Sequence, residues 1–243
     1  MFLPYLIFAM RPAEADALVV DGYVLGCRQG EAWRRYQPTE MPSSFGFLEI
    51  GVGSRLFQTA TVRIQPNELR TAYTVDWPIP EGVFYSGVAE IPREVQAVGA
   101  GRDRYLSIVS QFARNRGCLA PRPYLTQVWR GDFEGNGSDQ EVIEAVSRPS
   151  VRFGFAEASD WSLVLLRWTA QGQERVYPLA YSFPKAGQPL EWCRLRAIAD
   201  FDGDGRMEIV TSSRHRLGRA ATLWSTQSGK VLPLAEYNLD VSP

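Results

Sequence analysis

At residues 200–208 the chain reads Asp-Phe-Asp-Gly-Asp-Gly-Arg-Met-Glu, which places a carboxylate at the first, third, fifth and ninth positions. Calcium prefers a cage of several oxygen atoms at about 2.3–2.6 Å, and a tight loop with carboxylates at alternate positions provides one. The two glycines allow positive φ, so that the backbone turns sharply and the oxygens converge. The sequence therefore predicts a calcium site. Its expected ligands are the side chains of Asp200, Asp202, Asp204 and Glu208 and the carbonyl of Arg206.

A second acidic stretch, at residues 132–141, repeats this pattern as Asp-Phe-Glu-Gly-Asn-Gly-Ser-Asp-Gln-Glu. It has glutamate at the third position and asparagine at the fifth, where the later stretch has aspartate. Its last acid comes one residue later, so either Gln140 or Glu141 takes the ninth-position role. These departures predict a weaker calcium site, and the alternative is an acidic surface turn that binds nothing. The expected ligands are Asp132, Glu134, Asn136, Ser138 and Glu141.

The residues around both loops indicate strands and not the helices of an EF-hand. An EF-hand loop needs a bidentate glutamate at position twelve, where this chain has Thr211 in one copy and Ile143 in the other. The segments that flank the loops alternate in polarity or are rich in β-branched residues, as strands are. These segments are 124–131, 141–146, 192–199 and 208–212.

The repeat continues beyond the loops, because residues 168–181 match residues 224–237 with small changes of length. Each copy reads as a strand, a turn that contains Gly172 or Gly229, and a returning strand. One unit is therefore a strand, an acidic loop, a strand, a variable loop, and a final hairpin. Four antiparallel strands in each unit, repeated after some tens of residues, are typical of a propeller blade.

Residues 199–210, Ala-Asp-Phe-Asp-Gly-Asp-Gly-Arg-Met-Glu-Ile-Val, resemble the FG-GAP or VCBS repeat of integrin-α-like β-propellers. The resemblance covers roughly residues 124–237, and its specificity lies mainly in the loop at 200–208. It implies that the loops bind calcium and that the propeller binds other proteins or glycans, since fewer members of that family are enzymes. The N-terminal half has no such loop, so it holds either degenerate blades or a different fold.

The whole chain is predicted to be all-β and β-propeller-like, with four-stranded antiparallel blades and calcium-binding loops between strands. Its 243 residues, 45% of them hydrophobic, suffice for a substantial core in one domain or two. A partial or unusually small propeller is the alternative to a closed ring. We expect residues 1–17 to be a signal remnant or a first strand, 18–120 to be β-rich, and 121–243 to form two repeats of the FG-GAP/VCBS type. Residues 104–112 fit either a strand or a short helix.

The first residues and the cysteines bear on where the protein works. Residues 2–10 form an apolar run that is too short to span a membrane. This run is either the remnant of a secretory signal, with a cleavage site at residues 15–17, or a first buried strand. Calcium loops of this kind work where calcium is plentiful, so we expect an extracytoplasmic location, periplasmic or secreted. The three cysteines form either one disulfide, Cys27–Cys118, or buried free thiols.

The net charge and the motifs of the chain limit the classes of function that it can have. A net charge of −1 gives no general attraction to nucleic acid or to anionic membranes. His215 is the single histidine, in a polar segment typical of a solvated loop, and the chain contains no nucleophile elbow, phosphate-binding glycine loop or zinc-protease motif. We therefore expect a calcium-stabilised, non-catalytic domain that engages a protein or a glycan through its loop face. The alternatives are a hydrolase that uses loop carboxylates and a structural or envelope-assembly module.

One tryptophan stands apart from the others. Most tryptophans in the C-terminal half lie in predicted strands, where they would fill the blade cores. Trp161 instead follows Ala-Ser-Asp on the long loop between two strands. An exposed tryptophan on a loop is an anchor for a partner protein or for the face of a sugar. We therefore expect Trp161 to be a binding residue.

Overall fold

The structure is a computed structural model. The structure describes residues 16–30, 32–36, 44–66, 73–75, 81–99, 103–118, 121–150, 154–155, 157, 159–184, 188–215 and 218–240. These residues form antiparallel sheets and one helix, so the predicted all-β class is confirmed. The apolar run at residues 2–10 lies outside the described residues. Asp16 and Ala17, at the suggested cleavage site, belong to the first strand, and Ala17 is fully buried.

The N-terminal part forms a seven-stranded sheet in the order β1-β7-β4-β5-β6-β2-β3. Because β1 also pairs with β2, this sheet curls back on itself. Its strand order is not sequential, which differs from the simple up-and-down order of a propeller blade. The strands are β1 (Asp16–Val20), β2 (Tyr23–Gln29), β3 (Ala32–Arg34), β4 (Ser44–Gly51), β5 (Ser54–Pro66), β6 (Tyr73–Val75) and β7 (Val83–Tyr85).

The C-terminal part forms two antiparallel sheets whose strand order follows the sequence, except that β11, between β10 and β12 in the chain, belongs to another sheet. The five-stranded sheet has the order β13-β12-β10-β9-β8, and the four-stranded sheet has the order β15-β16-β17-β18. The strands of the first sheet are β8 (Gln96–Ala97), β9 (Tyr124–Gly131), β10 (Gln140–Val146), β12 (Ser162–Ala170) and β13 (Gln173–Ser182). Those of the second are β15 (Trp192–Ala199), β16 (Glu208–His215), β17 (Gly218–Gln227) and β18 (Lys230–Asp240). A separate two-stranded sheet pairs β11 (Gly154–Phe155) with β14 (Pro189–Leu190).

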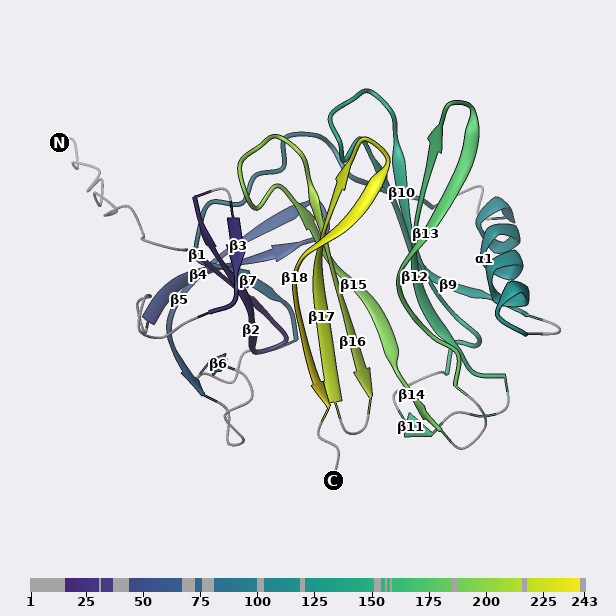
Figure 1. Ribbon diagram of the computed structural model, residues 1–243, viewed down its shortest axis with the longest axis horizontal. Coiled ribbons are helices and arrows are strands. Elements are labelled where there is room, and N and C mark those ends of the chain that lie inside the picture. Colours follow the sequence, from purple (N-terminus) through teal and green to yellow (C-terminus); the bar gives the residue numbers. More distant parts are fainter. Residues whose placement is uncertain are drawn as a thin grey trace.

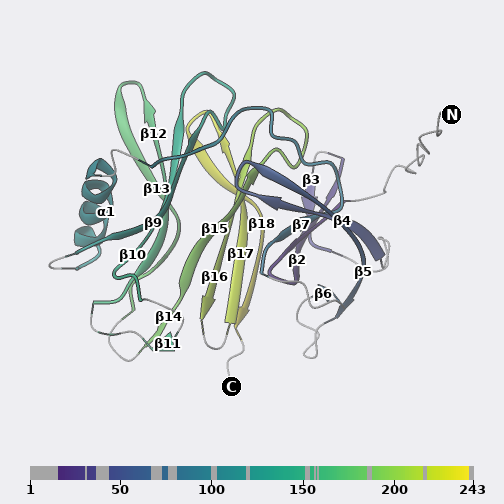
Figure 2. The ribbon, with the colours of Figure 1, turned by 180° about the vertical axis from the view of Figure 1, so that it is seen from behind.

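The sheets stack face to face, with the four-stranded sheet in the middle (Figures 1 and 2). One face of this sheet packs on the curled N-terminal sheet, through a core that includes Leu18, Tyr85 and Phe201. Its other face packs on the five-stranded sheet, through a core that includes Leu166 and Ile209. Successive side chains of a strand point to opposite faces, so β15 and β16 contribute to both cores. Strands β15 and β16 of the middle sheet are therefore largely buried on both faces.

Helix α1 (Asp103–Asn115) covers the outer face of the five-stranded sheet, which decides between the two structures expected for residues 104–112. The helix begins with an aspartate in its first turn and has an arginine in its last turn, as its dipole favours. It ends at Asn115, and the chain then turns at Gly117, whose φ is +92°, so that Gly117 N and Cys118 N donate to the final carbonyls of the helix. The buried residues Tyr105, Val109 and Ala113 face the sheet.

The three cysteines are free thiols, so the expected Cys27–Cys118 disulfide is not formed, and the alternative of buried free thiols holds for Cys27 and Cys193, while Cys118 is half-buried. Cys27 and Cys193 are buried in different sheets, where they pack as small apolar side chains. No helix formed by the described residues is both long and apolar enough to cross a membrane.

Candidate metal centre

The loop at residues 200–208 connects β15 to β16, so its two ends are held side by side. Ala199 pairs with Glu208 across these antiparallel strands, which brings the first and last acids of the loop together. Gly203 and Gly205 have φ of +72° and +83°, as predicted from the need for a sharp turn. The loop lies at the upper edge of the stack in Figure 1. Local sequence and strand pairing together therefore shape the site.

Three of the predicted ligands converge in this loop. The ligand oxygens of Asp200, Asp202 and Glu208 lie within 4.8 Å of one another. Asp200 and Glu208 are each only 1% exposed, and Asp202 is partly buried. A group of buried carboxylate oxygens at this spacing can hold a metal ion.

Backbone amides fix these carboxylates in place. Gly203 N and Gly205 N donate to the two oxygens of Asp200, at 2.6 and 2.8 Å. Phe201 N donates to Glu208 Oε2 at 2.9 Å, from a fully buried residue. Each acid retains lone pairs, because a carboxylate has about four acceptor sites. The loop is thus arranged before any ion binds.

Of the cations among the described residues, Arg28 acts on this cluster, because its charge lowers the pKa of Asp202 against the effect of burial, but it forms no ion pair with the three acids. Among the described residues, no arginine, lysine or histidine forms an ion pair with Asp200, Asp202 or Glu208. Burial, and then the charge of Asp202, raises the pKa of Glu208 to about 9. Burial also raises the pKa of Asp202, and the nearby charge of Asp204 adds to this shift. A protein relieves such a cluster by binding a proton or a cation.

Asp204 and Arg206 are joined to each other. Asp204 Oδ1 accepts a bond from Arg206 N at 2.7 Å, and Asp204 Oδ2 is paired with the Arg206 guanidinium. The converging group does not include Asp204. Its carboxylate would have to leave Arg206 in order to join the other three acids.

In the earlier loop, Gln140 occupies the position that Glu208 has in the later one. Gln140 Oε1 accepts a bond from Phe133 N at 2.6 Å, as Glu208 does from Phe201 N. Glu141, which we expected to be the ligand, does not join the loop. Its carboxylate is bound by Arg104, by Tyr105 Oη at 2.9 Å, and by Arg167. Aligning the two loops by position from the first aspartate places Gln140 opposite Glu208. Aligning them by their last acidic residue places Glu141 there instead, and this second alignment is wrong.

The other predicted ligands of the earlier loop bond mainly within it. Asn136 N and Gly137 N donate to the two oxygens of Asp132, at 3.0 and 2.9 Å. Glu134 accepts from the side chain of Asn136 and, at 3.2 Å, from Gly229 N of the β17–β18 turn. Ser138 N donates to Asn136 Oδ1. The loop reproduces the backbone form of the later one, with fewer charges.

Trp161 is buried, which corrects the prediction that it is an exposed anchor. Only 1% of its surface is exposed, and its ring stacks on Phe183 with centroids 5.8 Å apart. It lies in the core between the five-stranded sheet and α1. The preceding Asp160 is held by Arg148 and accepts a bond from Glu157 N, which turns the chain so that Trp161 faces inward. Trp161 therefore stabilises the fold and offers no surface to a partner.

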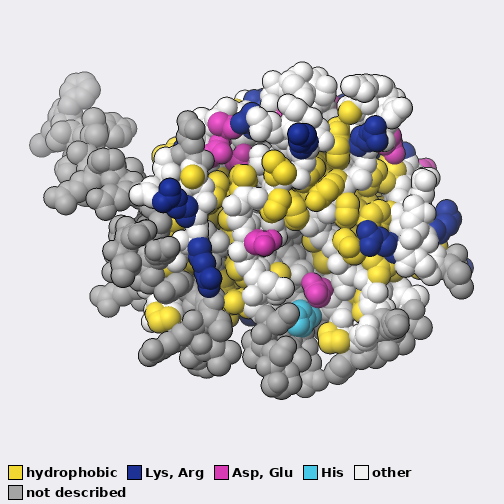
Figure 3. All heavy atoms as spheres, in the orientation of Figure 1, with side chains coloured by type: hydrophobic (Ala, Val, Ile, Leu, Met, Phe, Trp, Pro, Cys, Tyr) yellow, Lys and Arg dark blue, Asp and Glu magenta, His cyan; other side chains and the backbone are white. Residues whose placement is uncertain are grey.

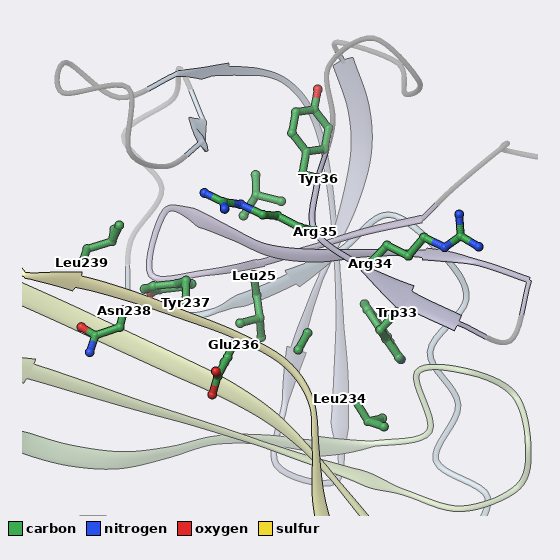
Figure 4. Close-up of a pocket in the computed structure, with 12 residues that line it drawn as sticks. Leu25, Trp33, Arg34, Arg35, Tyr36, Leu234, Glu236, Tyr237, Asn238 and Leu239 are labelled. Atoms are coloured by element: carbon green, nitrogen blue, oxygen red, sulfur yellow. The ribbon is translucent and has the colours of Figure 1, made fainter.

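One cavity of the described structure lies between the seven-stranded and four-stranded sheets (Figure 4). It has a volume of about 290 Å³, and its lining comes from β2, β3 and the residues after it, and β18. Trp33, Tyr36 and Leu234 contribute apolar surface, and Glu236 is the single carboxylate. This cavity therefore lacks the pair of acids that a glycosidase would need.

A larger cleft, of about 530 Å³, does contain two acids outside the metal cluster, Asp139 and Glu141. Both are ion-paired: Asp139 with Arg130, and Glu141 with Arg104 and Arg167. Burial alone would raise the pKa of Glu141, but bonds from Arg167 and Tyr105 outweigh it and lower this pKa. A general acid needs a raised pKa, so the cleft does not support the hydrolase alternative.

We compared the chain with models of known protein families, with curated proteins and with solved structures, and found no match. The metal centre therefore stands on its own geometry.

The buried acid at position 208 predicts an unusual pH dependence in EDTA. The pKa of Glu208 is about 9 in the folded protein, above its ordinary value of 4.5, so the folded state holds a proton that the unfolded chain releases. This contribution to stability is complete below pH 4.5 and is lost as pH rises through the folded pKa. We expect the free energy of unfolding to fall by a few kcal/mol between about pH 5 and pH 8, at up to about 1.4 kcal/mol per unit.

Urea denaturation at a series of pH values measures this effect. In millimolar calcium the slope should flatten, because an ion replaces the proton. A flat profile in EDTA would show that Glu208 ionises freely, and the argument for a cation at this site would lose its electrostatic basis.

Proposed function

We propose that residues 200–208 bind one calcium ion that stabilises the fold. The single observation that carries this proposal is the convergence of three carboxylates, of Asp200 and Glu208, which are buried, and of Asp202, which is partly buried, with no ion pair to any of them among the described residues. The cation would neutralise charge that otherwise raises the pKa of Glu208. It would also link the end of β15 to the start of β16, two strands whose side chains contribute to both cores. Asp204, once released from Arg206, and the carbonyl of Arg206 are the further ligands we propose.

The donor atoms favour calcium among the common metals. The residues of this loop offer carboxylate and carbonyl oxygens, with no cysteine or histidine between positions 200 and 208. Hard oxygen ligands suit calcium and magnesium, whereas zinc and copper prefer nitrogen or sulfur. Magnesium demands a strict octahedron and gives up its water reluctantly, while calcium accepts irregular cages of six to eight oxygens. A loop that fixes its acids with backbone amides fits calcium better.

We further propose that the two C-terminal sheets are propeller-type blades and that the protein is a non-catalytic binding domain. The strand order of both sheets and the resemblance of residues 199–210 to FG-GAP and VCBS repeats support this. An extracytoplasmic location is proposed because a site of this kind in extracellular modules works at about 10⁻⁴–10⁻³ M calcium. The partner is proposed to be a protein or a glycan.

The surface offers a place for such a partner. A cleft of about 320 Å³ lies between β13 on one side and β16 and β17 on the other. Hydroxyl groups of Thr211, Ser213 and Thr222 line it, beside the indole of Trp224. Figure 3 shows apolar side chains gathered in the upper middle of one face of the molecule. A concave surface that combines apolar and hydroxyl side chains is typical of a ligand site.

Thermal unfolding with and without calcium tests the metal proposal. For wild type we expect millimolar calcium to raise the free energy of unfolding by about 2.7 kcal/mol at a hundredfold excess over Kd. Asp202→Ala should lose most of this rise, because it removes a converging ligand. Asp139→Ala is the matched control, since this half-exposed acid pairs with Arg130 outside the cluster. An equal response in all three proteins, or none in wild type, would refute the site.

A further inference from the structure

One arginine joins the two acidic loops. Arg93, which lies before β8, donates from Nε to the carbonyl oxygen of Asp132 at 2.5 Å and from Nη2 to that of Phe133 at 3.3 Å. The same Nη2 donates to the carbonyl oxygen of Gly205 in the other loop. Met207 N also donates to the carbonyl oxygen of Phe133, at 2.8 Å. The loops are therefore one connected structure at the edge of the stack.

The guanidinium of Arg93 places a fixed positive charge beside the earlier loop. Its Nε lies 3.9 Å from Asp132 Oδ2, and the Arg93 side chain is 27% exposed. It also lies so close to Gly135 that a Cβ added there would come within 2.9 Å of Nη1. The loop has glycine at this position, with a φ of +69°. An arginine cannot lose its charge in a protein, so this cation is permanent.

The earlier loop also lacks the acid that completes the later one. At the ninth position, Gln140 is uncharged, and its side-chain oxygen accepts hydrogen bonds from Phe133 N and Glu134 N. Both oxygens of Asp132 and both of Glu134 already accept hydrogen bonds. Calcium affinity depends on the number of charged ligands, and at the first, third, fifth and ninth positions this loop has two carboxylates where the later loop has four. The earlier loop therefore has less negative charge for an ion to neutralise.

We propose that Arg93 stands in for calcium at residues 132–140, so that the chain holds one calcium ion and not two. In this arrangement Arg93 keeps the earlier loop closed at any calcium concentration. Through Gly205 it also supports the backbone of the later loop, which is ready to receive its ion. The number of ions rests on the proposed function, whereas the role of Arg93 in closing the earlier loop does not.

The number of calcium ions per chain, measured by titration calorimetry with calcium chloride, tests the claim that the chain holds one ion. Wild type should bind one ion per chain. The double variant Arg93→Met, Gln140→Glu removes the internal cation and restores the ninth-position acid, so it should bind two. Two ions in wild type, or one in the double variant, would overturn the inference. No binding by wild type would overturn the proposed function. The claim that Arg93 closes the earlier loop would then be tested by a measurement without calcium.

Hydrogen exchange in EDTA, followed by mass spectrometry, tests the claim that Arg93 keeps the earlier loop closed. Peptides that span residues 132–140 should exchange slowly in wild type and at least tenfold faster in Arg93→Met, and calcium should not restore their protection. Arg93→Lys should be intermediate, because lysine keeps the charge but not the fork of donors. Arg130→Met is the control, since Arg130 binds only the exposed edge of this loop, at Asp139. Unchanged exchange in Arg93→Met would overturn the role of Arg93.

Discussion

Replacing Glu208 with glutamine should make the protein more stable than wild type in EDTA and less stable than wild type in calcium. Glutamine removes a carboxylate that is 1% exposed and keeps the oxygen that accepts a bond from Phe201 N. The same chain already contains this arrangement, because Gln140 accepts from Phe133 N. At pH 8 the gain in EDTA should be about 3 kcal/mol, set by the charge that no longer has to be neutralised. In calcium the variant loses a charged ligand and with it the response to the ion.

Urea denaturation of both proteins, in EDTA and in 10 mM calcium chloride, measures this crossing of stabilities. Glu141→Gln is the matched control, because Glu141 is 2% exposed but is paired with Arg104 and Arg167. Removing one partner of a buried ion pair leaves the other uncompensated, so this variant should be less stable in both conditions. If Glu208→Gln were destabilised in EDTA as well, Glu208 would act as a structural acid and not as a metal ligand.

Replacing Trp161 with alanine should cost about 3–5 kcal/mol of stability, as large aromatic deletions from a core do. The indole fills the space between the five-stranded sheet and α1, and its stacking on Phe183 would also be lost. For a chain of this length the melting temperature should fall by roughly 10 °C. Differential scanning calorimetry measures the fall, and the calcium affinity of residues 200–208 should not change.

Leu232→Ala provides the comparison, because this apolar side chain is 50% exposed and should cost about 0.5 kcal/mol or less. A Trp161→Ala protein with the stability of wild type would contradict the buried position. It would return Trp161 to the role of a surface anchor that the sequence suggested.

The strands and turns next to the acidic loops were predictable because their signals are local. Glu208-Ile-Val-Thr has the β-branched residues of a strand, and Gly203 and Gly205 stand where the loop needs positive φ. Residues 104–112 were ambiguous because a short segment with buried residues at 105 and 109 fits two periodicities. Packing against the sheet selects the helix, and the local sequence carries no signal of this contact.

The parts of the site that the sequence left open depend on distant contacts. Gln140 and Glu141 are neighbours in one strand, so they point to opposite faces, and only the strand pairing shows which one faces the loop. Trp161 follows a loop segment, but the ion pair between Arg148 and Asp160 turns it inward. Arg93 lies far along the chain from Gly205, and nothing in its own neighbourhood marks it as a link between two loops.

The position of the four-stranded sheet has a consequence for how the protein is made. Its strands lie at residues 192–240, so they leave the ribosome after every strand of the two sheets that they separate. Until then, the apolar surface that Leu18 and Tyr85 on one side and Leu166 on the other share with the middle sheet lacks that covering layer. Exposed apolar faces and open strand edges make nascent chains prone to aggregate. The outer layers are therefore expected to need chaperones until synthesis delivers the layer that joins them.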